Sequence, residues 1–406
     1  MAFKLLHAAQ DLWRAVYGPH LVAPVRAGAR FDNGVMVERP DQVQQVACSS
    51  EPASTAIDGS CVQADNRREH EGQRAKGASM RRARQVMVRL LVVVGLVAAV
   101  PLVSAGPAAA ASWGTGAPLP SPRVRLTAVS DRNGYVYAIG GEDPLTSQVV
   151  ASVFRYNPST NRWRTVAPMP VARTAAVAVR GNDGRLYVFG GRNAAGQALD
   201  RTEAYDPSTG SWTRLAAMPT ARWGAAAAKA SDGRIYVIGG CCGSEPELPT
   251  VEAYDPSSNR WSTRAPIPVV GIASAAAVAA NQRVYVFGGA ISGDSMPLVQ
   301  VYNPATNSWR FDYGMPTARQ AHGARPGANG RIYVFGGFDG NDQFLGSVDV
   351  YRPDTKTWEP GPAMPTARAY LGSAVRGTTI YALGGLGSFT STSTTTSSKN
   401  EILTTP

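Results

Sequence analysis

Five arginines each follow a proline by three positions, and they recur along most of the chain: Arg123, Arg173, Arg222, Arg319 and Arg368. If the fold brings them to one face, their clustered guanidinium groups suit carboxylates or phosphates through paired hydrogen bonds. A structural interpretation is also open, because a residue copied in every unit can bond to loop carbonyls and cap strand ends. One unit breaks the pattern, since Pro268 is followed by Gly271 instead of arginine.

Acidic loop residues form a second set of candidate contacts, suited to polar ligands such as glycans: Glu142, Glu245, Asp294 and Asp339. The alternative is that they are ordinary solvated loop residues. The segment from Asp339 to Asp342 faintly suggests calcium but is more typical of a turn, so we expect no metal there. Cys241 and Cys242 are adjacent, and they form either a strained vicinal disulfide or two free thiols.

Sequence motifs of enzymes are mostly absent. The chain has no Gly-x-Ser-x-Gly, no His-Glu-x-x-His and no phosphate loop. His322 is the one histidine beyond residue 111, which removes most metal and triad chemistry there. The net charge is +11, but no Lys/Arg-rich run follows residue 111, so we expect no nucleic-acid partner.

The elements that must position these residues are repeats. Glycine doublets recur every 48 to 50 residues, at Gly140-Gly141, Gly190-Gly191, Gly239-Gly240, Gly288-Gly289, Gly336-Gly337 and Gly384-Gly385. A tryptophan keeps the same spacing, at Trp113, Trp163, Trp212, Trp261, Trp309 and Trp358. The 406 residues include 42 glycines and 29 prolines, which favours strands and turns over a helix bundle.

Each repeat is predicted to form four strands, a to d. In the second repeat these are Thr174–Arg180, Leu186–Gly191, Arg201–Tyr205 and Trp212–Ala216. The doublet allows positive φ and close backbone approach at the end of strand b. We expect the tryptophan to be buried in the gap between adjacent sheets.

The doublet, Tyr-x-Pro and Trp pattern resembles the kelch repeat, over Ser112 to Pro406. This resemblance implies an all-β fold, a six-bladed β-propeller, with loops d–a and b–c on one face. In some kelch proteins, arginines at such positions bind acidic peptides or sugar acids. Copper oxidases that share the motif need two histidines and two tyrosines, which the single His322 cannot supply, so we expect no cofactor.

The last repeat lacks strand d, and the segment Ser112–Ala117 around Trp113 is left over at the start. Its pairing with the last blade, beside a strand c at Glu401–Thr404, closes the ring without an open edge.

The N-terminal part is predicted to lie outside the propeller, which spans residues 112–406. Residues 80–111 combine arginines, an apolar run and an Ala-rich end, typical of a signal peptide or a membrane anchor. Residues 1–79 are either an upstream extension before a true start at Met80 or Met87, or a disordered tail. Whether residues 80–111 are a signal peptide or a membrane anchor, they are expected to place the propeller outside the cell, secreted in the first case and anchored in the second.

Three functions are compatible with these features. The first is an exported binding module that recognises an acidic peptide, a glycan or a cell-surface partner through the d–a/b–c face, as a monomer. The second is an enzyme, a sugar-acid (sialic acid) mutarotase, because some bacterial exported kelch proteins isomerise sialic acid. The third is a structural scaffold. Fold alone does not separate them.

Overall fold

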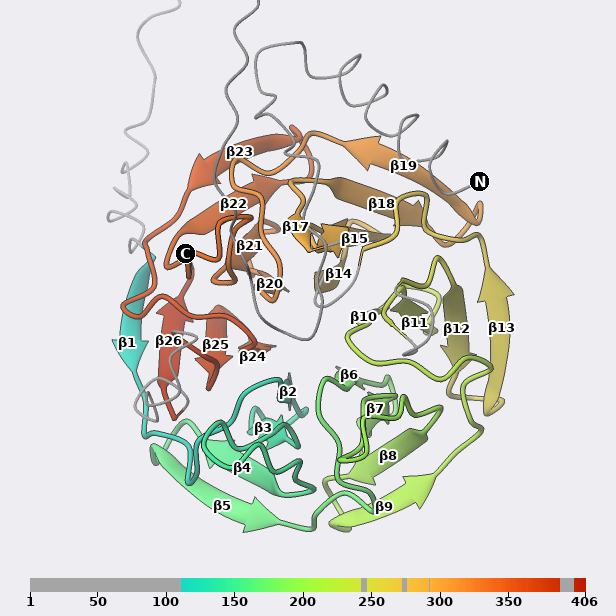
Figure 1. Cartoon of the computed structure of the whole chain (residues 1–406), viewed down its shortest axis with the longest axis vertical. Helices are drawn as coiled ribbons and strands as arrows, with labels where there is room; N and C mark the ends of the chain where they lie inside the picture. Colours follow the sequence, from blue (N-terminus) through green and yellow to red (C-terminus); the bar gives the residue numbers. More distant parts are fainter. Residues whose placement is uncertain (1–110, 242–246, 272–275, 292, 388–397) are drawn as a thin grey trace, which may run out of the picture. The chain divides into compact units, whose positions relative to one another are not determined.

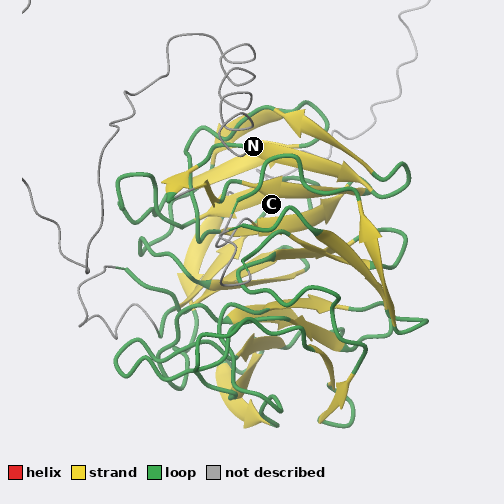
Figure 2. Cartoon of the chain, turned by 45° about the vertical axis from the view of Figure 1, so that its right-hand side comes forward, coloured by secondary structure: helices red, strands yellow, loops and turns green. Residues whose placement is uncertain are grey.

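The computed structural model describes residues 111–241, 247–271, 276–291, 293–387 and 398–406, with the backbone alone at 276–280. All regular structure in these ranges is β-strand, in six four-stranded sheets and one two-stranded sheet. The six larger sheets stand as blades around a common axis (Figure 1). Figure 2 shows strands joined by loops, and none of the described ranges contains a helix able to cross a bilayer.

Each blade places strand a nearest the axis and strand d outermost (Figure 1). Blade 1 comprises β2 (Thr127–Ser130), β3 (Val136–Ile139), β4 (Val153–Asn157) and β5 (Arg162–Val166). Blade 2 comprises β6 (Val177–Arg180), β7 (Leu186–Phe189), β8 (Thr202–Asp206) and β9 (Ser211–Arg214). Blade 3 comprises β10 (Ala226–Lys229), β11 (Ile235–Ile238), β12 (Val251–Asp255) and β13 (Arg260–Arg264).

The second half of the ring repeats this plan. Blade 4 comprises β14 (Ala276–Ala280), β15 (Arg283–Phe287), β18 (Val299–Asn303) and β19 (Ser308–Asp312), with a hairpin of β16 (Ala290–Ile291) and β17 (Asp294–Ser295) between b and c. Blade 5 comprises β20 (Gly323–Pro326), β21 (Ile332–Phe335), β22 (Val348–Arg352) and β23 (Thr357–Pro360). Blade 6 comprises β24 (Gly372–Arg376), β25 (Thr379–Leu383), β26 (Asn400–Thr404) and β1 (Ser112–Thr115).

Blade 6 confirms the predicted closure, because its outermost strand comes from the start of the propeller. β1 pairs antiparallel with β26, with Trp113 opposite Leu403. The Trp113 indole also donates a hydrogen bond of 2.8 Å to the carbonyl oxygen of Pro362 in blade 5. The inner strand β24 in turn contacts β2 of blade 1, so the ring is continuous.

The glycine doublets have the positive φ and the close backbone approach that the sequence predicts, and the structure shows that this approach joins neighbouring blades. Gly190 and Gly191 have φ of 60° and 100°, in the left-handed region. The N–H of Gly191 donates to the carbonyl oxygen of Arg222 in the next blade at 2.9 Å. A Cβ atom on Gly190 would lie 2.3 Å from that same oxygen, so the approach excludes any side chain.

The tryptophans also join blades, but they are half-buried, so the expectation of full burial is wrong. Strand d is outermost, and in β9 every residue except the half-buried Trp212 is exposed. Trp212 packs on Tyr205, with 5.2 Å between ring centroids, and donates to the carbonyl oxygen of Ala167 in blade 1 at 3.0 Å. Trp163, Trp261, Trp309 and Trp358 make the equivalent bond to the preceding unit.

Strand a begins later than predicted in blade 2, at Val177 instead of Thr174. The reason is Ala175, whose φ of 53° turns the backbone just before the strand. This turn recurs in other blades and shapes the opening of the central channel.

Candidate functional site

The five repeated arginines lie inside the blades and not around the mouth of the channel. Their exposed fractions are 6% for Arg123, 1% for Arg222 and 0% for the other three. Four of them pair with a carboxylate on strand c of the same blade: Arg173–Glu203, Arg222–Glu252, Arg319–Asp349 and Arg368–Glu401. This burial favours the structural interpretation and does not support the expectation that they bind a ligand.

The remaining two blades lack the acid on strand c, and each replaces the ion pair in a different way. Blade 4 has Gly271 in place of arginine, and Gln300 in place of the acid bonds to the N–H and carbonyl of Val269, each at 2.9 Å. Blade 1 has Phe154 at the acid position, and the Arg123 guanidinium lies 5.4 Å from its ring centroid. The buried arginine is thus kept only where a carboxylate or an aromatic ring on strand c faces it, which supports treating each of the four pairs as one structural unit.

Burial lowers the pKa of Arg173, and the neighbouring Glu203 opposes that effect. The arginine therefore stays charged because its partner is buried with it. The four carboxylates were not predicted, although a signal exists in the sequence: an Asp or Glu follows each paired arginine by 30 or 33 positions.

A ring of backbone hydrogen bonds surrounds the channel at the start of the inner strands. Arg125, Ala175, Ala321 and Tyr370 have φ between 51° and 55°, and Gly224 occupies the equivalent place in blade 3. The Ala175 N–H donates to the Arg125 carbonyl at 2.8 Å, and the Gly224 N–H donates to that of Ala175 at 2.9 Å. The Arg125 N–H donates to Tyr370, whose own N–H donates to Ala321. Left-handed backbone is unfavourable for bulky side chains, and this ring holds it in place.

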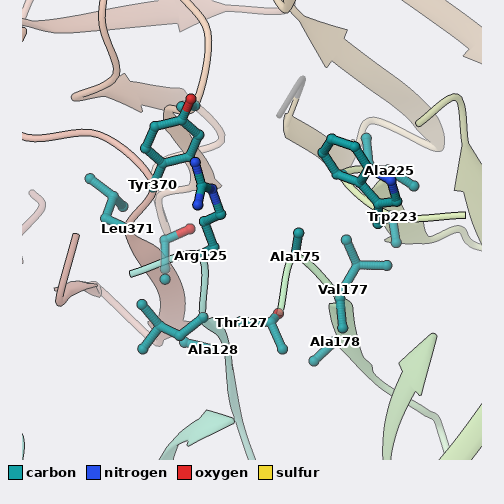
Figure 3. A pocket seen from close by; sticks show the side chains of 18 of the residues that line it. Arg125, Thr127, Ala128, Ala175, Val177, Ala178, Trp223, Ala225, Tyr370 and Leu371 are labelled. Atoms are coloured by element: carbon teal, nitrogen blue, oxygen red, sulfur yellow. The ribbon is translucent and has the colours of Figure 1, made fainter. Parts of the chain in front are cut away.

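Loops d–a and b–c meet at this ring, as the resemblance implies. Short antiparallel bridges join Val124 to Glu142 and Trp223 to Cys241. Within the ring lies a cavity of about 140 Å³ whose wall consists largely of alanine and glycine. Figure 3 shows Arg125 beside Tyr370 on one side of this cavity and Trp223 across from them. We call Arg125, Tyr370 and Trp223 the rim residues.

The rim residues are held by charge and by aromatic contacts. The Arg125 guanidinium lies 4.6 Å from the centroid of the Tyr370 ring and forms an ion pair with Glu142. Its side chain is 35% exposed, so this arginine is accessible to a ligand, unlike the repeated arginine Arg123 two positions earlier. Arg192 stacks over Trp223 at 5.2 Å. Two guanidinium groups beside two aromatic faces can bind a ligand that is both planar or ring-shaped and acidic.

His322 lines the same cavity, but both of its ring nitrogens are buried and neither has a hydrogen-bond partner among the described residues. Burial, with Arg319 nearby, lowers the pKa of His322 to about 3. The imidazole is therefore neutral at physiological pH. Its equivalents are Leu126 in blade 1 and Leu371 in blade 6, so it occupies an apolar packing position.

The other predicted site residues do not gather at one place. Glu142 lies at the mouth, whereas Asp294 is exposed on β17. Asp339 accepts the N–H groups of Asn341 and Gln343, at 2.8 and 3.0 Å, so it orders its own turn. Glu245 and Cys242 lie outside the described residues, and Cys241 is buried, so the vicinal disulfide stays a prediction. Within the described ranges, no group of three or more His, Cys, Asp or Glu is arranged to hold a metal ion.

The rim residues were not predicted as a site. Arg125 comes from blade 1, Trp223 from blade 3 and Tyr370 from blade 6, so no local motif contains them. A weak signal is their position, two residues after the repeated arginine for Arg125 and Tyr370.

Comparison with known proteins identifies the repeats. The family model of the KLHDC2/KLHL20/DRC7 Kelch-repeats domain matches residues 123–311, and that of the Kelch motif matches residues 327–365. The solved structure of YjhT matches with a TM-score of 0.58 at 18% identity, over 71% of this chain and 94% of that one. At this identity the likeness shows the fold.

A curated protein matches over a short stretch. The transposase for insertion sequence element IS6120 from Mycolicibacterium smegmatis is 58% identical over 43 residues, which is 11% of this chain. The match covers 13% of the transposase. Because so little of that protein is present, its activity is not inferred for this chain.

Proposed function

Since this chain belongs to the kelch-repeat family and folds as a six-bladed β-propeller, we propose that it is an exported binding module whose ligand enters the channel mouth at the rim residues. The observation that carries the proposal is the cavity of about 140 Å³ with Arg125, Tyr370 and Trp223 around small side chains. Bulky residues in strained backbone at an opening are typical of functional positions.

The ligand class follows from the side chains at the mouth. Aromatic faces such as Trp223 and Tyr370 pack on the apolar faces of sugar rings, and a guanidinium group binds a carboxylate in a paired geometry. Arg125 and Arg192 outnumber Glu142, so the mouth favours a negative ligand. We propose an acidic glycan as the ligand, and an acidic peptide is the competing outcome of the test.

A binding screen tests this proposal. Acidic glycans, their neutral counterparts and acidic peptides are offered to the whole protein and to Arg125→Met and Trp223→Ala variants. We expect each variant to lose at least about tenfold in affinity, as removal of one charged hydrogen bond or one stacking contact does. The control is Arg155→Met, because Arg155 also lies 4.6 Å from a tyrosine ring, that of Tyr135, but outside the cavity.

The outcomes separate the three functions. Equal binding by wild type and Arg125→Met protein would overturn the site, and absence of binding to every ligand would leave the scaffold function. An NMR measurement of anomer exchange on any bound sugar acid tests the mutarotase alternative. That reaction needs a proton carrier at the ligand, and Glu142 is the carboxylate at the mouth.

Export is part of the proposal and is supported by the sequence of residues 80–111, which lie outside the described residues. Cell fractionation tests it. Recovery of the propeller from the cytoplasm alone would contradict it.

A further inference from the structure

The channel has a second opening at the opposite ends of the inner strands. A cavity of about 220 Å³ lies there, lined by the last residues of β2, β6, β10 and β20: Ser130, Arg180, Lys229 and Pro326. The mouth cavity instead lies at the residues that precede or begin these strands. Both cavities share Ala128, Ala178, Ala227 and Arg325 in their walls, so these residues mark the boundary between them, and Arg325 is the charged one. We call this second space the lower opening.

Three cationic side chains line the lower opening, those of Arg180, Lys229 and Arg325, and their hydrogen bonds within the described residues all go to uncharged groups. Arg180 donates to the carbonyl oxygen of Asp131 at 2.7 Å, and Lys229 donates to the side-chain oxygen of Asn182 at 2.6 Å. Arg325 donates to the carbonyl oxygens of Ser373 and Ala324. Among the described residues, none of the three takes part in an ion pair.

The nearest carboxylates are already engaged by other groups. Asp183 forms an ion pair with Arg185 at 2.6 Å and accepts the hydroxyl of Tyr187 at 2.7 Å. The Asp131 carboxylate is buried and accepts the N–H of Tyr135 and the hydroxyl of Tyr137. The positive charge of the lower opening is therefore not balanced within its own wall.

The charges also repel one another. Burial lowers the pKa of Lys229, and the neighbouring Arg180 and Arg132 lower it further, with Asp183 opposing them. Burial lowers the pKa of Arg325 to about 10. Arg325 remains charged at neutral pH, and a bound anion in this partly buried place would relieve the repulsion among the cations.

We propose that the lower opening binds a multivalent oxyanion, phosphate or sulfate, between Arg180, Lys229 and Arg325. The remaining N–H groups of Arg180 and Lys229 supply donors for such an ion, and guanidinium groups match its geometry. The rest of the wall is small, with Ala128, Ala178 and Ala227 leaving the space open. The oxyanion is either free or an ester group on a larger molecule that reaches the channel from this side.

Isothermal titration calorimetry on the whole protein at low ionic strength tests the proposal. Inorganic phosphate and inorganic sulfate are the probes, with acetate as the monovalent comparison. We expect wild-type protein to bind phosphate and sulfate more tightly than acetate, and Lys229→Met to weaken phosphate binding by about tenfold or more. Arg155→Met is the matched control, because that arginine stacks on Tyr135 outside both cavities and its loss should leave phosphate binding unchanged.

A thermal melt without phosphate separates a binding role from a structural one. The Lys229→Met variant should melt no lower than wild type, because it removes a repelled charge. It should also lose the rise in melting temperature that phosphate gives the wild type. Phosphate binding that is equal in wild type and in an Arg180→Met/Lys229→Met double variant, or no phosphate binding by the wild type, would overturn the proposal.

Comparison of inorganic phosphate with a phosphate monoester distinguishes the two sources of the oxyanion. Tighter binding of the monoester indicates a group carried on a larger ligand. Equal binding indicates the free ion. If the lower opening binds no oxyanion, the proposal of ligand binding at the mouth is unaffected, because that proposal is measured with different variants and ligands.

Discussion

Replacement of Glu203 by glutamine tests the buried arginine–acid pairs directly. Arg173 Nη1 lies 2.6 Å from Glu203 Oε2, and neither side chain has exposed surface. The change keeps the shape of the side chain but leaves the Arg173 charge buried without its counter-charge. Breaking a buried pair in this way costs about 3–5 kcal/mol, a large part of a typical folding free energy of about 5–15 kcal/mol.

The loss of folding free energy in Glu203→Gln depends on the burial of the pair, so the experiment includes two comparison variants. An Arg173→Met/Glu203→Met double variant removes both charges together, and we expect it to lose less than Glu203→Gln alone, by about 2 kcal/mol or more. Blade 4 already folds with Gly271 and Gln300 at these positions, which shows that a blade tolerates loss of the whole pair. The exposed pair Arg234–Asp232 is the control, and Arg234→Met should change stability by less than about 1 kcal/mol.

Urea denaturation followed by circular dichroism measures these differences, with the slope of the transition checked for each variant. A Glu203→Gln protein within about 1 kcal/mol of wild type, at an unchanged slope, would refute the assignment of the pair as a structural unit. Equal losses in the single and double variants would refute the reasoning about the unpaired charge.

Three further predictions concern other positions. Because the pKa of His322 is about 3 in the folded protein and near 6.5 when unfolded, stability from this group is present above pH 6.5 and falls as the pH drops toward 3, by up to about 1.4 kcal/mol per pH unit; His322→Leu should flatten this dependence in urea titrations at several pH values. Deletion of Ser112–Thr115 removes β1 from blade 6 and should lower the melting temperature sharply, whereas deletion of residues 1–79 should leave it unchanged; equal melts of both would contradict the closure. Trp212→Ala should lower the free energy of unfolding by about 2–3 kcal/mol, because the loss for a fully buried tryptophan is about 3–5 kcal/mol and Trp212 is half-buried. Trp212→Phe should lower it by about 1 kcal/mol through the lost indole hydrogen bond. Urea denaturation measures both.

The periodic features of the fold were predictable because the same residues recur at the same positions in every repeat. The doublets, the tryptophans and the leftover Trp113 segment predict six blades and their closure, and the pairing of β1 with β26 confirms it. The positive φ of Gly190 and Gly191 was also predictable, since few other residues adopt it.

Side-chain direction was not predictable in the same way. Spacing alone does not tell whether Arg173 points to the channel or into its own blade, because the partner Glu203 comes from strand c, beyond the next loop. The rim residues could not be predicted from the sequence for a related reason. Arg125 and Tyr370 meet only because the ring closes and brings blade 1 beside blade 6.

The closure of the ring also sets the order of events during synthesis. The Asn400 side chain donates a hydrogen bond to the carbonyl oxygen of Ala117, a contact across 283 positions of the chain. The first strand of the propeller therefore lacks its partner strand until the chain has been synthesised beyond Thr404. Until then β1 and the inner edge of blade 1 remain open to other strands, so we expect the nascent chain to mature slowly and to be exposed to aggregation.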